Sequence, residues 1–124
     1  MTLQQRTVAI VEDDDLVRSA TASLIRSLGL EAAQFPSAPE CLAADPDQFG
    51  CIISDINMPE MSGLEFQDAL RTRGIAVPLI LMTAYPTDDL LTRALDNGAH
   101  CFLQKPYSPD TLVDCLADIF GPLE

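Results

Sequence analysis

Short apolar runs that alternate with stretches of helical periodicity constrain the fold of this chain more than any other feature. The clearest runs are Val8–Val11, Cys51–Ser54 and Pro78–Thr83. Their residues do not follow the apolar–polar alternation of a half-exposed strand, so each is expected to be a strand buried on both faces. Strands of this kind, alternating with helices, indicate a parallel sheet that helices cover on both sides.

Two weaker strands, Glu31–Phe35 and Cys101–Leu103, complete a set of five strands and five helices. A chain of 124 residues has room for one domain, which we place at residues 1–124. Right-handed crossovers between parallel strands give a doubly wound sheet, and the common five-stranded order is 2-1-3-4-5. The sequence therefore predicts an α/β, flavodoxin-like fold with a crevice at the carboxyl ends of the first and third strands.

The expected helices are recognised from apolar residues at helical spacing and from residues that favour helix ends. We expect Asp15 to cap the first helix and Gly29 to end it, and Ser108 or Asp110 to cap the last. Core-facing positions are expected in the first helix at Leu16, Val17, Ala20, Leu24, Ile25 and Leu28, and in the fourth at Leu90, Leu91, Ala94 and Leu95.

The charge of the chain excludes several function classes. Nineteen acidic residues against seven basic ones give a net charge of −12, and such a surface repels nucleic-acid phosphates and anionic lipid. No apolar run approaches the roughly 20 residues that a membrane span requires. The polar N-terminal residues lack the apolar core of a signal peptide. We therefore expect a cytoplasmic protein that binds neither nucleic acid nor membrane directly.

The cysteines and the single histidine do not indicate a metal or redox site. The cysteines stand at positions 41, 51, 101 and 115, without the close spacing of a zinc site or a redox dithiol. We expect them to be free thiols in apolar surroundings. His100 precedes the fifth strand and is expected to be a surface residue.

Acidic residues follow the expected strands where this fold has its crevice. Glu12, Asp13 and Asp14 follow the first strand, and Asp55 follows the third. Neighbouring strands lie ~4.8 Å apart, and two carboxylates ~5 Å apart repel by roughly 3 kcal/mol at an effective dielectric constant near 20. A bound Mg²⁺ would offset this repulsion. The alternative is an acidic helix start that the helix dipole stabilises without any ligand.

Two further strand ends favour a phosphoryl ligand. Thr83 ends the fourth strand, and Lys105 follows the fifth. An ammonium and a hydroxyl beside carboxylates and a metal suit the oxygens of a phosphoryl group. Either residue alone would be an ordinary strand terminus, so the prediction depends on the convergence of four strand ends.

Taken together, these residues show that the chain resembles a receiver domain of bacterial two-component response regulators. The resemblance covers nearly the whole chain and rests on Glu12-Asp13, the run Asp55–Gly63, Thr83-Ala84 and Lys105-Pro106. The spacing of Thr83–Pro86 is similar to that in receivers of the FixJ/NarL type. Each motif alone is weak, but four motifs in this order at the ends of alternating strands are specific.

The resemblance implies a phosphoacceptor and a metal site. Asp55 would accept a phosphoryl group from a sensor histidine kinase or a phosphotransfer protein. Asp13 and Asp55 would ligate Mg²⁺ directly, Glu12 would act through the metal's water ligands, and Asn57 would supply its backbone carbonyl. Glu12 departs from the family, which most often has Asp at this position, so we expect altered metal affinity without loss of the site.

The resemblance also implies a conformational switch. Lys105 and Thr83 would contact the phosphoryl group, and the ring of Phe102 would follow Thr83 inward. The surface of the fourth helix, fifth strand and fifth helix would then change and control a downstream protein, an output domain absent from this chain, or a phosphorylation-dependent homodimer. Asn57 and Tyr85 lie where the family tunes dephosphorylation. Such a module catalyses only its own phosphoryl transfer and dephosphorylation, and we expect no other enzyme activity.

Two other functions are compatible with a similar sheet. A phosphohydrolase with an aspartate nucleophile has a second Asp two residues later, where this chain has Asn57, which does not titrate. A flavin-binding module needs a Ser-, Thr- or Gly-rich phosphate loop after the first strand. Glu12–Asp15 would repel a phosphate at that place.

Overall fold

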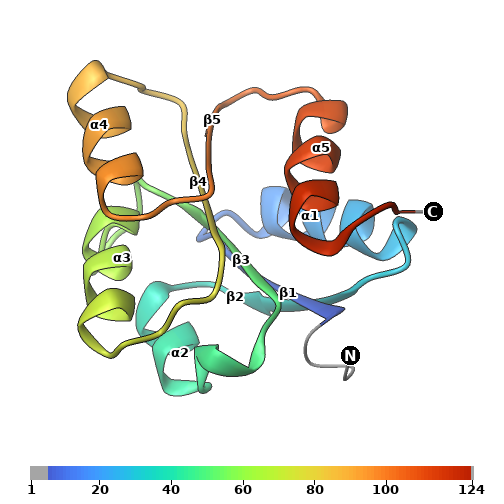
Figure 1. Ribbon diagram of the computed structural model, residues 1–124, viewed down its shortest axis with the longest axis horizontal. Coiled ribbons are helices and arrows are strands. Elements are labelled where there is room, and N and C mark those ends of the chain that lie inside the picture. Colours follow the sequence, from blue (N-terminus) through green and yellow to red (C-terminus); the bar gives the residue numbers. More distant parts are fainter. Residues whose placement is uncertain (1–5, 124) are drawn as a thin grey trace.

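A five-stranded parallel sheet with helices on both faces forms the centre of the molecule (Figure 1). The computed structural model describes residues 6–123. The strand order is β2-β1-β3-β4-β5, so the predicted doubly wound fold is confirmed. The strands are β1 (Thr7–Val11), β2 (Glu31–Phe35), β3 (Cys51–Asp55), β4 (Leu79–Thr83) and β5 (Cys101–Gln104).

Helices α1 and α5 cover one face of the sheet, and α2, α3 and α4 cover the other (Figure 1). The helices are α1 (Asp15–Ser27), α2 (Ala38–Ala43), α3 (Gly63–Thr72), α4 (Asp88–Asp96) and α5 (Pro109–Phe120), with a short 3₁₀ helix at Pro46–Gln48. No helix within residues 6–123 is long and apolar enough to cross a membrane.

The two faces of the sheet have separate cores because successive residues of a strand point to opposite sides. Ile10 and Ile53 pack on the α1/α5 side together with Ile25. Ile52 packs on the other side, together with Phe66. Both kinds of residue are fully buried, which explains why the strands have nearly unbroken apolar sequences.

The first turn and the exposed face of α1 differ from the prediction. The N-cap is Asp14, whose side chain accepts the backbone N–H of Val17 at 3.0 Å, and not Asp15. Leu16 is 83% exposed and Val17 is 37% exposed, so neither belongs to the core. Val17 and Ala20 instead line an apolar groove of about 540 Å³ between α1 and the segment after β5.

Helix α4 buries less apolar surface than its sequence pattern predicts. Within the described residues, Ala94 is the one fully buried position of this helix. Leu90 is partly buried against the core, whereas Leu91 and Leu95 are 39% and 48% exposed. The apolar stripe of α4 is therefore wider than the part that the sheet and α3 cover, and the prediction that Leu91 and Leu95 face the core is wrong.

Polar side chains of α3 hold the C-terminal end of α4. The buried Gln67 donates from Nε2 to the carbonyl of Ala94 at 2.9 Å. The guanidinium of Arg71 donates to the carbonyls of Asn97 at 3.3 Å and Gly98 at 3.2 Å. It also donates to the carbonyl of Ile75 at 2.7 Å, in the segment that leads into β4. These contacts replace part of the apolar anchorage that α4 lacks.

We predict that Arg71→Ala lowers the free energy of unfolding by about 1–3 kcal/mol, because carbonyls at the end of α4 lose a charged donor. Chemical denaturation measures this change. Arg93→Ala is the matched control, since Arg93 is exposed on α4 and its removal should change stability by less than about 0.5 kcal/mol. Equal effects of the two substitutions would show that charge alone, and not the contacts of Arg71, matters.

Candidate functional site

The carboxyl ends of β1, β3, β4 and β5 meet at one edge of the sheet. Val11 pairs with Ser54, and Asp55 pairs with Met82. The backbone N–H of Lys105 donates to the carbonyl of Thr83 at 2.8 Å, which places the residue after β5 beside the end of β4. The parallel order therefore brings together the residues that the sequence predicted to converge.

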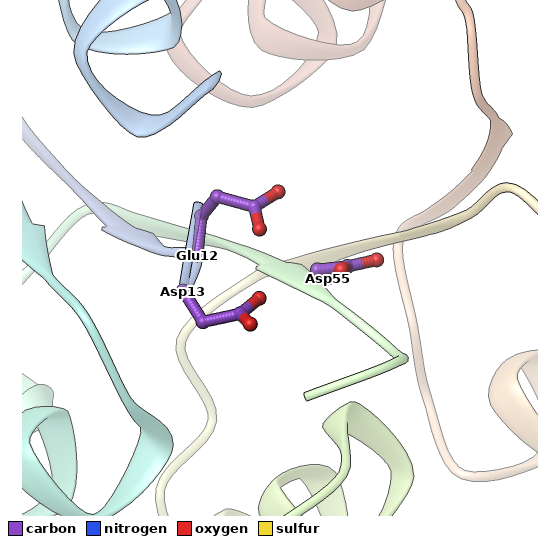
Figure 2. Close-up of side chains that lie close together, drawn as sticks. All are labelled: Glu12, Asp13 and Asp55. Atoms are coloured by element: carbon purple, nitrogen blue, oxygen red, sulfur yellow. The ribbon is translucent and has the colours of Figure 1, made fainter. Parts of the chain in front are cut away.

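Three carboxylates from two strand ends point into one small space (Figure 2). Glu12 and Asp13 follow β1, Asp55 ends β3, and one oxygen of each lies within 4.8 Å of the others. Glu12 is 2% exposed and Asp55 is 6% exposed, whereas Asp13 faces solvent. The atoms that could ligate a metal are all carboxylate oxygens, the type of ligand that hard cations such as Mg²⁺ and Ca²⁺ prefer.

Lys105 lies against this acidic cluster. Its Nζ is 2.7 Å from Oε1 of Glu12 and 3.5 Å from Oδ2 of Asp55. With the carboxylates ionised, the negative charges of the cluster exceed the positive charge of Lys105 by two. That balance fits a divalent cation, so the residues present suit the metal that the sequence predicts.

Burial and charge act against each other in this site. Burial raises the pKa of the Glu12 carboxyl above its ordinary value, although its hydrogen bond to Lys105 opposes the rise. Burial likewise raises the pKa of Asp55, and the charge of Lys105 again opposes it. For Lys105, burial would lower the pKa of the ammonium, but its contacts with Glu12 and Asp55 outweigh burial and raise that pKa.

Thr83 is fully buried, and its hydroxyl is engaged with the loop that follows β3. Its Oγ1 donates to Oδ1 of Asn57 at 2.6 Å and accepts the backbone N–H of Tyr85 at 3.0 Å. Phe102 is partly buried and packs on the core that faces α3 and α4. The predicted roles of Thr83, Phe102 and the backbone carbonyl of Asn57 remain predictions at this point.

Two residues shape the site although the sequence analysis gave them no separate role. A Cβ at Gly63 would lie 2.5 Å from the carbonyl oxygen of Asp55, so only glycine allows α3 to begin this close to β3. Arg18 donates from Nη1 to the carbonyl of Glu12 at 2.8 Å. Gly63 lies at the end of the Asp55–Gly63 motif, whereas no sequence signal identifies the contact of Arg18.

The remaining predicted residues lie outside the acidic cluster. All four cysteines, which fall within the described residues, are free thiols; Cys101 is half-buried and the other three are buried. His100 is on the surface, with Nε2 3.8 Å from Oδ2 of Asp118. Met58 and Met61, which were not among the predicted site residues, pack against the core from the loop that follows β3.

The chain belongs to the response regulator receiver domain family, whose sequence model matches residues 8–117. This membership implies phosphorylation-dependent switching within a two-component system. Together with the strand order and the acidic edge of the sheet, it confirms the family resemblance seen in the sequence.

Relatives and a solved structure agree with this membership. The chain is 38% identical over 111 residues to the transcriptional regulatory protein TdiR of Thauera aromatica, covering 89% of this chain and 49% of TdiR. It is 38% identical over 115 residues to the transcriptional regulatory protein FixJ of Azorhizobium caulinodans, covering 92% of this chain and 54% of FixJ. The chain thus spans about half the length of these relatives.

Among solved structures, the chemotaxis protein CheY4 of Vibrio cholerae superposes with a TM-score of 0.84 at 29% sequence identity. The superposition covers 92% of this chain and 98% of the CheY4 chain. The sheet, its helices and their order are therefore shared over nearly the full length of both chains.

We predict that Asp13→Asn weakens Mg²⁺ binding roughly tenfold or more, because it removes one charged oxygen ligand from the cluster. Titration calorimetry with MgCl₂ measures the affinity. The matched control is Asp14→Asn, which makes the same charge change one residue away and keeps a side chain that caps α1 equally well. Similar losses in both variants would contradict direct ligation by Asp13.

Proposed function

We propose that this chain is a phosphorylation-controlled switch in which Asp55 is the phosphoacceptor. The observation that carries the proposal is the convergence of three carboxylates and one ammonium at the carboxyl edge of the sheet. Family membership supports the same function. Glu12, Asp13 and Asp55, with the backbone carbonyl of Asn57, would hold Mg²⁺.

The proposed reaction transfers a phosphoryl group from a phosphohistidine to Asp55. A carboxylate oxygen of Asp55 attacks the phosphorus, the nitrogen–phosphorus bond of the donor breaks, and an acyl phosphate forms. Such a transfer depends mainly on positioning and charge neutralisation. Lys105 is already within 3.5 Å of Asp55 and would contact a phosphoryl oxygen, and Mg²⁺ would neutralise further charge when bound.

The phosphoryl group would then stabilise a second conformation of the domain. Shifting a two-state equilibrium from 1:99 to 99:1 takes ~5.5 kcal/mol. Hydrogen bonds to charged groups contribute about 1.5–3 kcal/mol each. New bonds from Lys105 and Thr83 are therefore of the right size to produce most of that shift, with Phe102 moving into the space that Thr83 leaves.

The proposed partners follow from the same function. The donor would be a sensor histidine kinase or a phosphotransfer protein. The recipient would be a downstream protein or an output domain outside this chain, contacted through α4, β5 and α5. Leu91 and Leu95 on α4 are partly exposed and add apolar area to this surface. The cytoplasmic location and the lack of direct nucleic-acid binding stay predictions.

An aspartate-nucleophile phosphohydrolase is the competing function. Its reaction needs an acid or base near the nucleophile, and Asn57 offers an amide that neither gains nor loses a proton near neutral pH. We therefore propose a domain that phosphorylates and dephosphorylates itself and does not turn over phosphate esters. Sustained hydrolysis of a generic phosphate ester would favour the hydrolase instead.

We predict that the protein, incubated with Mg²⁺ and acetyl phosphate, gains one phosphoryl group by intact mass, because Asp55 has the metal ligands and the lysine beside it. Asp55→Asn and chelation of the metal should each abolish the gain. Asp47→Asn is the matched control, since Asp47 is an exposed acid of the 3₁₀ helix. A persistent adduct in Asp55→Asn would contradict the assignment.

We also predict that Mg²⁺ and beryllofluoride, a phosphoryl mimic, convert the protein from monomer to dimer as measured by light scattering after size exclusion. Leu95→Glu should prevent the dimer, because it replaces exposed apolar area of α4 with a charge. Leu16→Glu is the control on α1, since Leu16 is 83% exposed on the other side of the sheet. A dimer that Leu95→Glu leaves intact would exclude this surface.

A further inference from the structure

The hydroxyl of Thr83 can donate one hydrogen bond, and the contacts in the structure identify its acceptor. A backbone N–H can only donate, so Oγ1 must accept the bond from Tyr85 N at 3.0 Å. Its own proton is then directed to Oδ1 of Asn57, 2.6 Å away. Thr83 is fully buried, and a buried hydroxyl needs a partner in every populated conformation.

A phosphoryl group on Asp55 would compete for the hydrogen bond that the Thr83 hydroxyl donates. Ionised phosphoryl oxygens carry no proton and therefore act only as hydrogen-bond acceptors. Thr83 can form a hydrogen bond with them only by donating its hydroxyl proton. We propose that the side chain of Asn57 is a latch that keeps Thr83 in the resting conformation by accepting the hydrogen bond that Thr83 would otherwise donate to the phosphoryl group. The inference rests on the proposed function and makes Asn57 a positioning residue.

The surroundings of the two partners favour a latch that opens. Asn57 is exposed, so its carboxamide can bond to water once it is released. Thr83 has no such alternative, because it is buried at the end of β4. An ionised phosphoryl oxygen is a stronger acceptor than a neutral amide oxygen. The Thr83 hydroxyl therefore donates its hydrogen bond to Asn57 in the resting protein and to the phosphoryl group when one is present.

The position of Asn57 makes the latch local to the reaction. It follows Asp55 by two residues, on the loop that leads to α3. Thr83 also accepts from the backbone of Tyr85, in the segment that leads to α4. The hydrogen bond between Thr83 and Asn57 thus connects the loop after Asp55 to the end of β4, from which the chain leads to α4. Opening this bond would release the segment between β4 and α4 from that loop.

The test measures the affinity for beryllofluoride at saturating Mg²⁺ by titration calorimetry. Asn57→Ala removes the acceptor and leaves the resting conformation with a buried donor that lacks its partner. We expect it to bind beryllofluoride more tightly than the wild type by a factor of about 5–30. Asn57→Asp keeps an acceptor at the same place and should bind no more tightly than the wild type.

A double-mutant cycle separates the latch from other effects of the substitution. Thr83→Val removes the proton, so adding Asn57→Ala in that background should leave the affinity for beryllofluoride unchanged. An equal gain in both backgrounds would overturn the proposal, because Asn57 would then act without Thr83. The absence of any gain in the single variant would overturn it as well.

Thermal unfolding of the same four proteins without ligand tests the bond independently of phosphorylation. The two substitutions should be non-additive, because each alone already breaks the same hydrogen bond. Additive effects would show that the bond does not form in the resting protein. A wild type that fails to bind beryllofluoride would refute the proposed function, whereas non-additive unfolding would still establish the contact itself.

Discussion

The contact of Lys105 with Glu12 and Asp55 is the interaction on which the rest of the site depends. It joins Lys105, which follows β5, to Glu12, which lies 93 positions earlier in the chain and follows β1. Strands β3 and β4 lie between β1 and β5 in the sheet. Without the lysine, three carboxylates would repel one another in a partly buried space. With it, the repulsion is partly offset, and the cluster still keeps a net negative charge that attracts a divalent cation.

The three carboxylates differ in their exposure to solvent. Glu12 and Asp55 are buried and contact Lys105, and the backbone of Asp55 lies close to Gly63. Asp13 faces solvent, which leaves one side of the cluster open to water and to an incoming group. The proposed function requires both properties, because a closed cage would exclude the phosphoryl donor.

The strands and the site residues could be predicted because both depend on short-range patterns. An unbroken apolar run identifies a buried strand, and the polar residue at its carboxyl end lies at the sheet edge, as Asp55 does at the end of β3. Helix faces were harder to predict. Periodicity locates an apolar stripe but does not say what covers it: Val17 faces a groove, and Leu91 and Leu95 face solvent. The bond between Thr83 and Asn57 depends on the rotamers of two side chains, one at the end of β4 and the other in the loop after β3, and no sequence spacing reveals these rotamers.

Because α4 buries few apolar side chains, a change at the Thr83 hydrogen bond could alter the position of this helix. Ala94 is the one fully buried residue of this helix among those described, and Gln67 and Arg71 hold its C-terminal end through backbone carbonyls. Its N-terminal end follows directly from the segment that begins at Thr83. A helix fixed at one end by polar contacts and at the other by a short segment responds to a change in that segment more readily than one packed along its length. In the proposed function, the chemistry would thus lie at the strand ends and the response on α4, the helix with the fewest buried residues among those described.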